Sequence, residues 1–479
     1  MMALPSTKLA DLAEHWDVAV IGAGPAGMSA ATITARAGLS TVLLDENPGP
    51  GGQIYRGIAA SPLANRDVLG EDYWKGLEVL NAFAGSGTVY CPRATVWSLT
   101  RERTIGVSSD GAARMLQARR VIVATGALER PMPIPGWTLP GVMSAGAAQT
   151  LLKSSALVPQ GRIIMAGCGP LLWLLASQLI AAGCTIAAIL ETTDRSAWKR
   201  AVPHALQFAM SPYVAKGLRL LRSVQRHTRV VPGVIDIEAR GAGKLREVVF
   251  RTTASGEERL AADMLLLHQG VVTNPNLALA AGVEHRWDET QLCWQPVLRG
   301  DGATNLDGIA IAGDGAGIAG AEAAAERGSI AALDVLKALA PAALASVTDE
   351  QVIRNRLSRY ARGRRFLDPL YRPADQFRRP QGDTIVCRCE EVTARQIVET
   401  VPLGVVGPNQ MKSFLRCGMG PCQGRLCNLT VTELIAATLE VSPTQVGTYR
   451  LRPPVKPVSL AEIAAMPKSD TAIKAVVRG

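Results

Sequence analysis

Two stretches of the chain share one order of apolar and glycine-rich positions. Residues 17–46, DVAVIGAGPAGMSAATITARAGLSTVLLDE, predict a buried strand, a glycine turn, a helix and a second strand. Residues 163–190, IIMAGCGPLLWLLASQLIAAGCTIAAIL, repeat this order with no charged residue over 28 positions. That length would suffice for a membrane-spanning helix, but Gly167, Gly169 and Pro170 interrupt it near its start. The pattern therefore predicts two α/β units with buried strands and no transmembrane segment.

The first glycine turn has the spacing of a dinucleotide-binding loop. Gly22 permits the tight turn, Gly24 lets backbone amides approach a pyrophosphate, and Gly27 lets the helix pack closely on the strand. Asp45 ends the second strand and is the candidate acceptor for a ribose hydroxyl. Glu46 is the poorer candidate, because a one-residue step turns its side chain to the opposite face. The helix N-terminus is then expected to face the phosphates.

Three later segments offer glycine or acidic residues to the same ligand. PGPGGQIYRG places Gly52 and Gln53 soon after the second strand, and VIVATGALERP places Gly126 after another short strand. IAIAGDGAGIAGAEAAAERG places Gly313 and Asp314 between a strand and a helix. Because this element comes so late, the chain is expected to return to its first domain, where Asp314 would hold ribityl hydroxyls and the helix N-terminus would face the phosphate.

Together these elements resemble the flavoproteins of the glutathione-reductase type, which have two dinucleotide-binding domains, over roughly residues 14–340. The resemblance implies an α/β fold with a discontinuous FAD-binding domain. The flavin half contains no CxxC pair, so the redox disulfide of disulfide reductases is missing. His268, after the apolar run MLLL, is expected to be a satisfied core or loop histidine. No histidine has a recognisable acid–base arrangement, so the catalytic residues are unknown.

The second glycine turn keeps two of the three glycines. Gly167 and Gly169 are in place and Glu191 ends the following strand, so these three residues are candidate nucleotide contacts. Leu172 stands where a third glycine would let helix and strand approach each other. This side chain weakens the case for NAD(P)H, which the flavoprotein resemblance implies for this domain. A different adenine nucleotide and a vestigial domain without a ligand remain the alternatives.

Charge is concentrated in one segment of the 479-residue chain. Residues 346–380 hold nine arginines against four acids, within a formal net charge of +10. We interpret this segment as a solvated linker, with an acidic partner subunit or a cofactor phosphate as alternatives. Nucleic acid is disfavoured, because no stacking aromatics are interleaved with the arginines. The N-terminus lacks a signal-peptide or transit pattern, which makes the cytoplasm the expected compartment.

Five of the nine cysteines fall between residues 387 and 427. Cys387 and Cys389 precede the capping-box pattern of Thr393 and Gln396, which predicts a short helix. The stretch CGMGPCQGRLC follows at residues 417–427, with Gly424 marking a turn before a second helix. Clustered cytosolic thiolates indicate zinc or an iron–sulfur cluster. A C-x-C pair is unusual for structural zinc, and a flavin on the same chain favours a 2Fe-2S cluster.

This cysteine pattern looks like the small helical domain named after bacterioferritin-associated ferredoxin. The resemblance implies Cys387, Cys389, Cys422 and Cys427 as metal ligands, whereas the position of Cys417 is variable. The whole chain resembles the α (A) subunit of bacterial heteromeric opine oxidases, hydroxyproline dehydrogenases and hydrogen cyanide synthase. That family implies an electron-transfer role beside a flavoprotein β subunit of the amino-acid-oxidase type, which oxidises a C–N bond of an amino acid or opine.

The same resemblance leaves room for a small iron–sulfur γ subunit and for a second nucleotide or FMN at a subunit interface. Two rival functions remain: a free-standing NAD(P)H-dependent flavoprotein reductase that uses the cluster, and a flavin-binding scaffold with structural zinc. The expected domains are an FAD-binding domain (14–150 and 301–345), a second dinucleotide-binding-like domain (151–300), a basic linker (346–380), a 2Fe-2S domain (381–445) and a tail (446–479).

Overall fold

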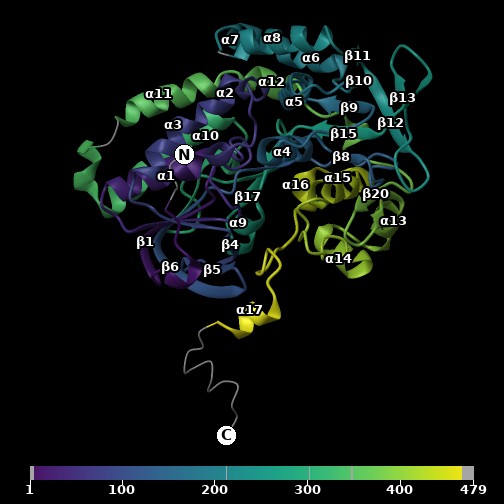
Figure 1. The fold of residues 1–479 in the computed structure, drawn as a ribbon. Helices are drawn as coiled ribbons and strands as arrows, with labels where there is room; N and C mark the ends of the chain where they lie inside the picture. Colours follow the sequence, from purple (N-terminus) through teal and green to yellow (C-terminus); the bar gives the residue numbers. More distant parts are fainter. Residues whose placement is uncertain (1–4, 212, 301, 347–348, 467–479) are drawn as a thin grey trace.

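The first domain is built on a central sheet that is mostly parallel (Figure 1). The computed structural model describes residues 5–211, 213–300, 302–346 and 349–466. Residues 467–479 of the predicted tail lie outside this part. The parallel strands, in spatial order, are β3 (Val89–Pro92), β2 (Thr41–Asp45), β1 (His15–Ile21) and β6 (Ala112–Val123), with β19 (Ile309–Ile311) beside the end of β6.

Both faces of this sheet are buried. Val18 and Val20 of β1 pack on one side, in a cluster that includes residues of the helices α1 (Pro25–Arg36), α3 (Gly76–Ala84) and α10 (Ala321–Leu339). Ala19 and Ile21 pack on the other side, against the antiparallel strands β4 (Thr95–Leu99) and β5 (Thr104–Ser109). Alternate residues therefore serve opposite cores, as a fully buried strand requires.

The first domain is discontinuous, as the sequence predicted. Strand β19 pairs in parallel with β6, with Ile309 opposite Val121, so the chain returns to the first sheet after the second domain. Helix α10 then packs closely on α1, because a Cβ added at Gly328 would lie 2.0 Å from the backbone oxygen of Ala26. A side chain at this position would force the two helices apart.

The second domain contains the predicted strand, turn, helix and strand in the uncharged stretch. These are β9 (Ile163–Cys168), α5 (Pro170–Ala181) and β10 (Ile186–Glu191). The strands β11 (Arg229–Val231), β15 (Met264–Gln269) and β8 (Val142–Ser144) complete a parallel sheet of five, while β12 (Val234–Arg240), β13 (Glu247–Thr252) and β14 (Glu257–Ala261) form an antiparallel sheet. Within the described residues, every helix is too short or too polar to cross a bilayer.

Four further helices belong to the second domain. They are α4 (Ala145–Ser155), α6 (Arg195–Ala201), α7 (Ala205–Ala209) and α8 (Tyr213–Gln225), and Figure 1 shows the last three together on one outer side of the molecule. The segment predicted as a basic linker is mostly helical, with α11 (Glu350–Ala361) and α12 (Arg364–Leu370). Helix α11 packs on α10, and α12 packs on α6, so this segment covers both dinucleotide-binding-like domains.

The C-terminal module is small, helical and has a core of its own, which we call the cysteine module (residues 381–449). Its elements are β20 (Ile385–Cys387), β21 (Val392–Thr393), α13 (Ala394–Thr400), α14 (Pro408–Leu415), α15 (Asn428–Leu439) and α16 (Pro443–Val446). Its core includes Ile397, Met411, Ile435 and Tyr449. The predicted capping box is confirmed: Thr393 and Gln396 exchange the two expected hydrogen bonds at the start of α13.

Candidate functional site

The first glycine loop leaves a cradle that side chains would fill. Gly22 has φ +105°, and a Cβ there would lie 2.5 Å from the backbone oxygen of Ala124. A Cβ at Gly27 would lie 1.8 Å from the oxygen of Gly22, which explains why α1 starts so close to β1. Gly52 approaches Gly24 so closely that its Cβ would be 2.8 Å from the Gly24 Cα. These residues place the open N-terminus of α1 at the loop, as pyrophosphate binding requires.

The carboxylate of Asp45 is largely occupied by the loop itself. Its Oδ2 accepts a hydrogen bond from the Ala23 amide at 2.5 Å, and its Oδ1 accepts from the Asn47 amide at 2.7 Å. Burial raises the pKa of Asp45, although these amide bonds oppose the rise. The neighbouring Glu46 also borders the cavity and forms an ion pair with Lys456 at 2.5 Å. The ribose contact of Asp45 therefore stays a prediction, with Glu46 beside it.

The other candidate flavin contacts line the same cavity, which has a volume of about 1360 Å³. Gly52, Gln53, Gly126, Gly313 and Asp314 all border it. The Asp314 Oδ1 accepts hydrogen bonds from the amides of Ala319 and Gly320 at 2.8 and 3.1 Å, which fixes the turn before α10. This volume exceeds the roughly 300–1,000 Å³ of an ordinary ligand pocket. The residues present fit a flavin dinucleotide.

The second glycine loop borders the same cavity through Gly169 and Glu191. Gly167 has φ +141°, and a Cβ there would lie 1.7 Å from the backbone oxygen of His268. Leu172 is fully buried among the apolar residues between α5 and the sheet, as the sequence suggested. Burial raises the pKa of Glu191.

His268 is the satisfied histidine that the sequence indicated, and it also reaches the cavity. Its side chain is 1% exposed, and its Nδ1 lies 2.6 Å from Oε1 of Glu129. Glu129 ends β7 (Ala127–Glu129) and accepts the Gly146 amide at 2.8 Å through its other oxygen. The imidazole is thus held at a fixed orientation beside Gly169.

Lys153 is a buried cation that the sequence analysis missed. It is 2% exposed, and its Nζ donates to the backbone oxygens of Ile54 and Gln53 at 2.9 and 3.2 Å and to Oε1 of Gln149 at 3.0 Å. Burial, with Arg56 nearby, lowers the pKa of Lys153 to about 7. The sequence did carry one signal for a buried lysine. Lys153 directly follows Leu152, and both lie on the buried face of a helix whose first turn is rich in alanine.

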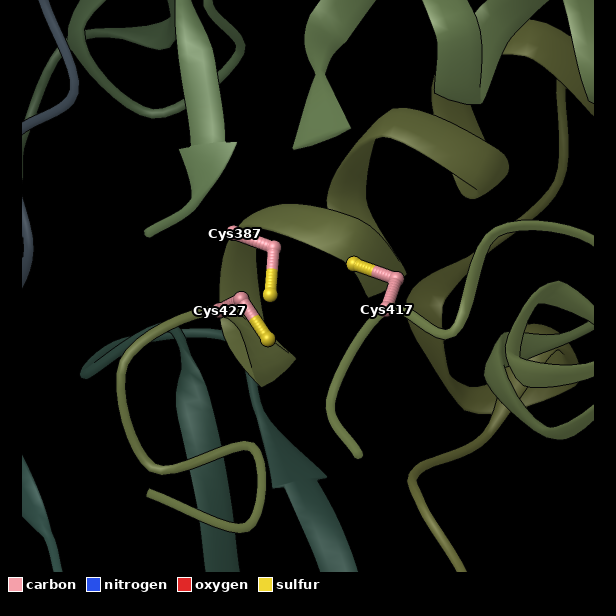
Figure 2. Close-up of side chains that lie close together, drawn as sticks. All are labelled: Cys387, Cys417 and Cys427. Carbon is pink, nitrogen blue, oxygen red and sulfur yellow. The ribbon is translucent and has the colours of Figure 1, made fainter. Parts of the chain in front are cut away.

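Three of the five clustered cysteines meet in the core of the cysteine module. The ligand atoms of Cys387, Cys417 and Cys427 lie within 4.8 Å of one another, and Figure 2 shows their sulfur atoms turned toward a common space. All three are buried. Hydrogen bonds from the thiols of Cys417 and Cys427 lower the pKa of Cys387 well below its usual range. The fully buried Cys417 thus lies beside two of the four predicted ligands.

The remaining two predicted ligands form a pair of their own. Cys389 is exposed, and its thiol lies beside the thiol and the backbone amide of Cys422. Gly420 packs against this pair, because a Cβ there would lie 2.2 Å from that of Cys389. Cys427 is the N-cap of α15, so the amides of that helix face the site, and Gly424 makes the predicted turn with φ +77°.

The four cysteines outside the module are packed among other side chains. Cys91, Cys168 and Cys293 are buried, and Cys184 is half-buried. Burial raises the pKa of all four thiols, that of Cys91 to about 11 and that of Cys168 to about 12. These thiols are therefore poor nucleophiles.

Buried charges join the cysteine module to the flavin half. Glu433 of α15 is 1% exposed and forms an ion pair with Arg378, while Nη1 of Arg130 lies 3.9 Å from its Oε1. Arg130 borders the cavity and donates to the backbone oxygens of Gln291 and Leu292 at 2.7 and 2.8 Å. This ion-pair cluster (Arg130, Arg378 and Glu433) fixes α15, and with it Cys427, relative to the cavity.

Comparison with known proteins assigns both parts of the chain. The family described as pyridine nucleotide-disulphide oxidoreductase matches residues 16–328, and the sarcosine oxidase A3 domain matches residues 381–467. The A subunit of an opine oxidase from Rhizobium meliloti is 50% identical over 476 residues, which cover 97% of this chain and 90% of the relative. This chain belongs to the opine oxidase A-subunit family. It is accordingly an FAD-dependent oxidoreductase of that family.

A more distant relative and a solved structure are also similar to this chain. The hydrogen cyanide synthase subunit HcnB of Pseudomonas aeruginosa is 32% identical over 92% of this chain and 96% of its own length. The L-proline dehydrogenase from P. horikoshii has a TM-score of 0.69 at 19% identity, over 94% of this chain and 79% of that one. At that identity the likeness shows the fold alone. It confirms the predicted architecture of two dinucleotide-binding domains with a C-terminal module.

Proposed function

We propose that this homologue of the opine oxidase A subunit is the FAD and 2Fe-2S electron-transfer subunit of a heteromeric dehydrogenase or oxidase. A partner flavoprotein subunit of the amino-acid-oxidase type would oxidise the C–N bond of an amino acid or opine. The observation that carries the proposal is the position of five clustered thiols on a module that is fixed to a dinucleotide cavity by the ion-pair cluster. The names of the relatives, which include the A subunits of two opine oxidases, support the substrate class.

The residues of the first loop would hold the flavin dinucleotide. Gly22, Gly24 and Gly52 would let it approach the backbone, and the N-terminus of α1 would face its pyrophosphate. When bound, a flavin supplies two-electron chemistry and a cluster supplies one-electron transfer. His268 and Glu129 also line the cavity, and their hydrogen bond would keep the imidazole in a fixed orientation toward a bound ligand.

The two groups of thiols fit a cluster with two irons. Such a cluster takes two thiolates on each iron, and the structure offers Cys387 with Cys427 as one pair and Cys389 with Cys422 as the other. Cys417 is a spare thiol beside the first pair. The predicted ligand set Cys387, Cys389, Cys422 and Cys427 therefore remains our proposal.

Structural zinc is the second candidate for this site. Thiolates around one zinc, with bonds of about 2.3 Å, lie about 4 Å apart. The sulfurs of Cys387, Cys417 and Cys427 lie within 4.8 Å of one another, close to that arrangement. The match of this module to a sarcosine oxidase domain does not itself name a metal. The NAD(P)H-dependent reductase is less favoured, because Leu172 occupies the third glycine position of its loop.

Metal and flavin analysis of anaerobically purified protein tests the proposal. We expect about two irons per chain beside one FAD, with a visible spectrum of both groups. Cys389→Ser and Cys422→Ser should each remove most of the iron, whereas Cys417→Ser should keep it. Zinc without iron would leave a flavoprotein with a structural metal. Anaerobic bleaching of the flavin by NADH would favour the free-standing reductase instead.

A further inference from the structure

The C-terminal tail returns to the first domain and borders the dinucleotide cavity. The Val455 amide donates to the backbone oxygen of Trp97 in β4 at 2.9 Å, and Val455 is 2% exposed. Lys456 forms an ion pair with Glu46 at 2.5 Å, directly after β2. Both residues line the cavity. Residues that are some 400 positions apart in the sequence thus form one wall of the cavity.

The position of this wall identifies the part of the ligand that it faces. In a dinucleotide-binding domain the acidic end of the second strand lies at the ribose of the adenosine half. Asp45 and Glu46 occupy that end, and Ala94 and Val96 continue the cavity beyond it. Val455 belongs to the same apolar cluster as Val96. The tail therefore covers the adenosine end of the cavity and not the flavin end.

The cysteine module reaches the same wall through one arginine. Arg425 lies between Cys422 and Cys427, borders the cavity, and donates from Nη1 to the Val455 oxygen at 2.8 Å. On its other side this loop is held by Asn276, whose Nδ2 donates to the Gln423 oxygen at 2.8 Å. The loop with the candidate metal-binding cysteines and the tail are thus one connected surface.

We propose that Arg425, Val455 and Lys456 are binding residues for the adenosine diphosphate half of the flavin dinucleotide, and that ligand binding and docking of the tail reinforce each other. Lys456 offsets the charge of Glu46 and adds a cation near a dianionic diphosphate. Coupling of this kind is reciprocal, so a docked tail raises the affinity for the dinucleotide and the dinucleotide holds the tail. The inference rests on FAD binding at the first loop and is independent of the metal.

Charge reversal at Lys456 tests the proposal in the flavin-free full-length chain. Lys456→Glu should weaken the binding of both FAD and ADP by about tenfold or more, because the introduced carboxylate and Glu46 would then lie together at the adenosine end of a dianionic ligand. ADP lacks the flavin, so a parallel loss for both ligands locates the effect at the adenosine half. The matched control is Arg452→Glu, which changes the same charge at an exposed position of the same tail. The control should keep both affinities within about twofold.

Hydrogen exchange of the wild-type chain gives a readout that does not depend on a variant. FAD and ADP should each slow exchange of the amides at 449–456, including the Val455 amide that bonds Trp97. Exchange that is unchanged by either ligand would overturn the proposal, as would equal affinities of Lys456→Glu and wild type. A wild-type chain that binds no FAD would instead remove the proposed function.

Discussion

Single glycines set the geometry of the first loop. Gly27 sits inside the first turn of α1, where its backbone is helical and needs no glycine for conformational reasons. Its role is spatial, because a Cβ would lie 1.8 Å from the Gly22 oxygen. Gly217 of α8 is the opposite case, since a Cβ there would meet no atom within 4 Å.

Alanine at these two helical positions should therefore change stability in opposite directions. Gly27→Ala should lower the free energy of unfolding by about 1–3 kcal/mol, as overpacking does, and should weaken FAD binding. Gly217→Ala should raise the free energy of unfolding by about 0.5–1 kcal/mol, because alanine loses less backbone entropy than glycine on folding. Urea unfolding of both variants, with FAD content measured on the same samples, checks the pair. Equal effects of the two substitutions would contradict the spatial role of Gly27.

Lys153 should make stability depend on pH. Burial lowers its pKa in the folded chain to about 7, whereas an unfolded lysine has a pKa of about 10.4. Between these values the unfolded chain binds a proton that the folded chain lacks, so stability rises with pH there. Between about pH 6.5 and 8.5 the free energy of unfolding of the wild type should rise by up to about 2 kcal/mol relative to that of Lys153→Met.

Urea unfolding of flavin-free protein at both pH values measures this difference. The exposed Lys244 provides the control variant, Lys244→Met, which should behave as the wild type. If the stabilities of Lys153→Met and the wild type changed with pH to the same extent, the three acceptors around Nζ would keep the ammonium group charged in the folded chain.

Local spacing in the sequence was enough to find the glycine loops and the cysteines, because their geometry depends on neighbours within one turn. Local spacing could not predict contacts between residues that are far apart in the sequence. Lys456 meets Glu46 only after the tail has returned to the first domain. Cys417 joins Cys387 and Cys427 only through the fold of the whole cysteine module. Which of these thiols bind metal is still a prediction.

Helix α15 carries both the start of the cysteine site and its attachment to the flavin half. Cys427 is its N-cap, and Glu433 lies on its buried side against Arg378 and Arg130. Burial lowers the pKa of Arg378 to about 10, although nearby Asp375 opposes this. Removing the carboxylate charge would leave the buried guanidinium of Arg130 without a counter-ion and Arg378 with Asp375 alone.

Glu433→Gln should consequently destabilise the chain by about 3–5 kcal/mol. It should also loosen the cysteine module, so that limited proteolysis cuts the chain near residues 379–384 sooner than in the wild type. The exposed Glu399 of α13 is the matched control, because Glu399→Gln should change stability by less than about 0.5 kcal/mol. A Glu433 variant as stable as this control would show that the ion-pair cluster does not hold the module.

Elements with strong local signals were predicted well, and the basic segment was not. The capping box of Thr393 and Gln396 and the order of strand, turn and helix after Gly161 depend on short-range patterns. Helix α11 also carried a signal, since Ile353 and Leu357 lie one turn apart and pack against α10. The arginines between them concealed this apolar face, which favoured the linker interpretation.

At the scale of the whole molecule, the basic segment has two sides. Arg364 borders the cavity and pairs with Asp368, whereas Arg359 and Arg356 lie on α11, away from the cavity lining. Arg359 is exposed, whereas Arg364 lines the cavity. An acidic partner subunit and a cofactor phosphate therefore both remain predictions for this segment.

Charge reversal of Arg359 should weaken co-purification of a partner subunit without changing FAD content, because this side chain does not line the cavity. Arg286→Glu, at an exposed position on β17 (His285–Asp288), is the control and should leave recovery of the complex unchanged. Pull-down from cells that express tagged chain and candidate partners gives the measurement. Full recovery with Arg359→Glu would count against this segment as the docking surface.

The return of the chain to its first sheet also determines when the protein can mature during synthesis. Strand β6 is complete at Val123, but its neighbour β19 begins at Ile309, and Lys456 arrives later still. At about 5–20 residues per second, a ribosome needs roughly 10–40 s between the two strands. During that interval the nascent first domain exposes one unpaired edge. Flavin insertion should therefore be nearly post-translational, and chains that stall before residue 309 should emerge without cofactor.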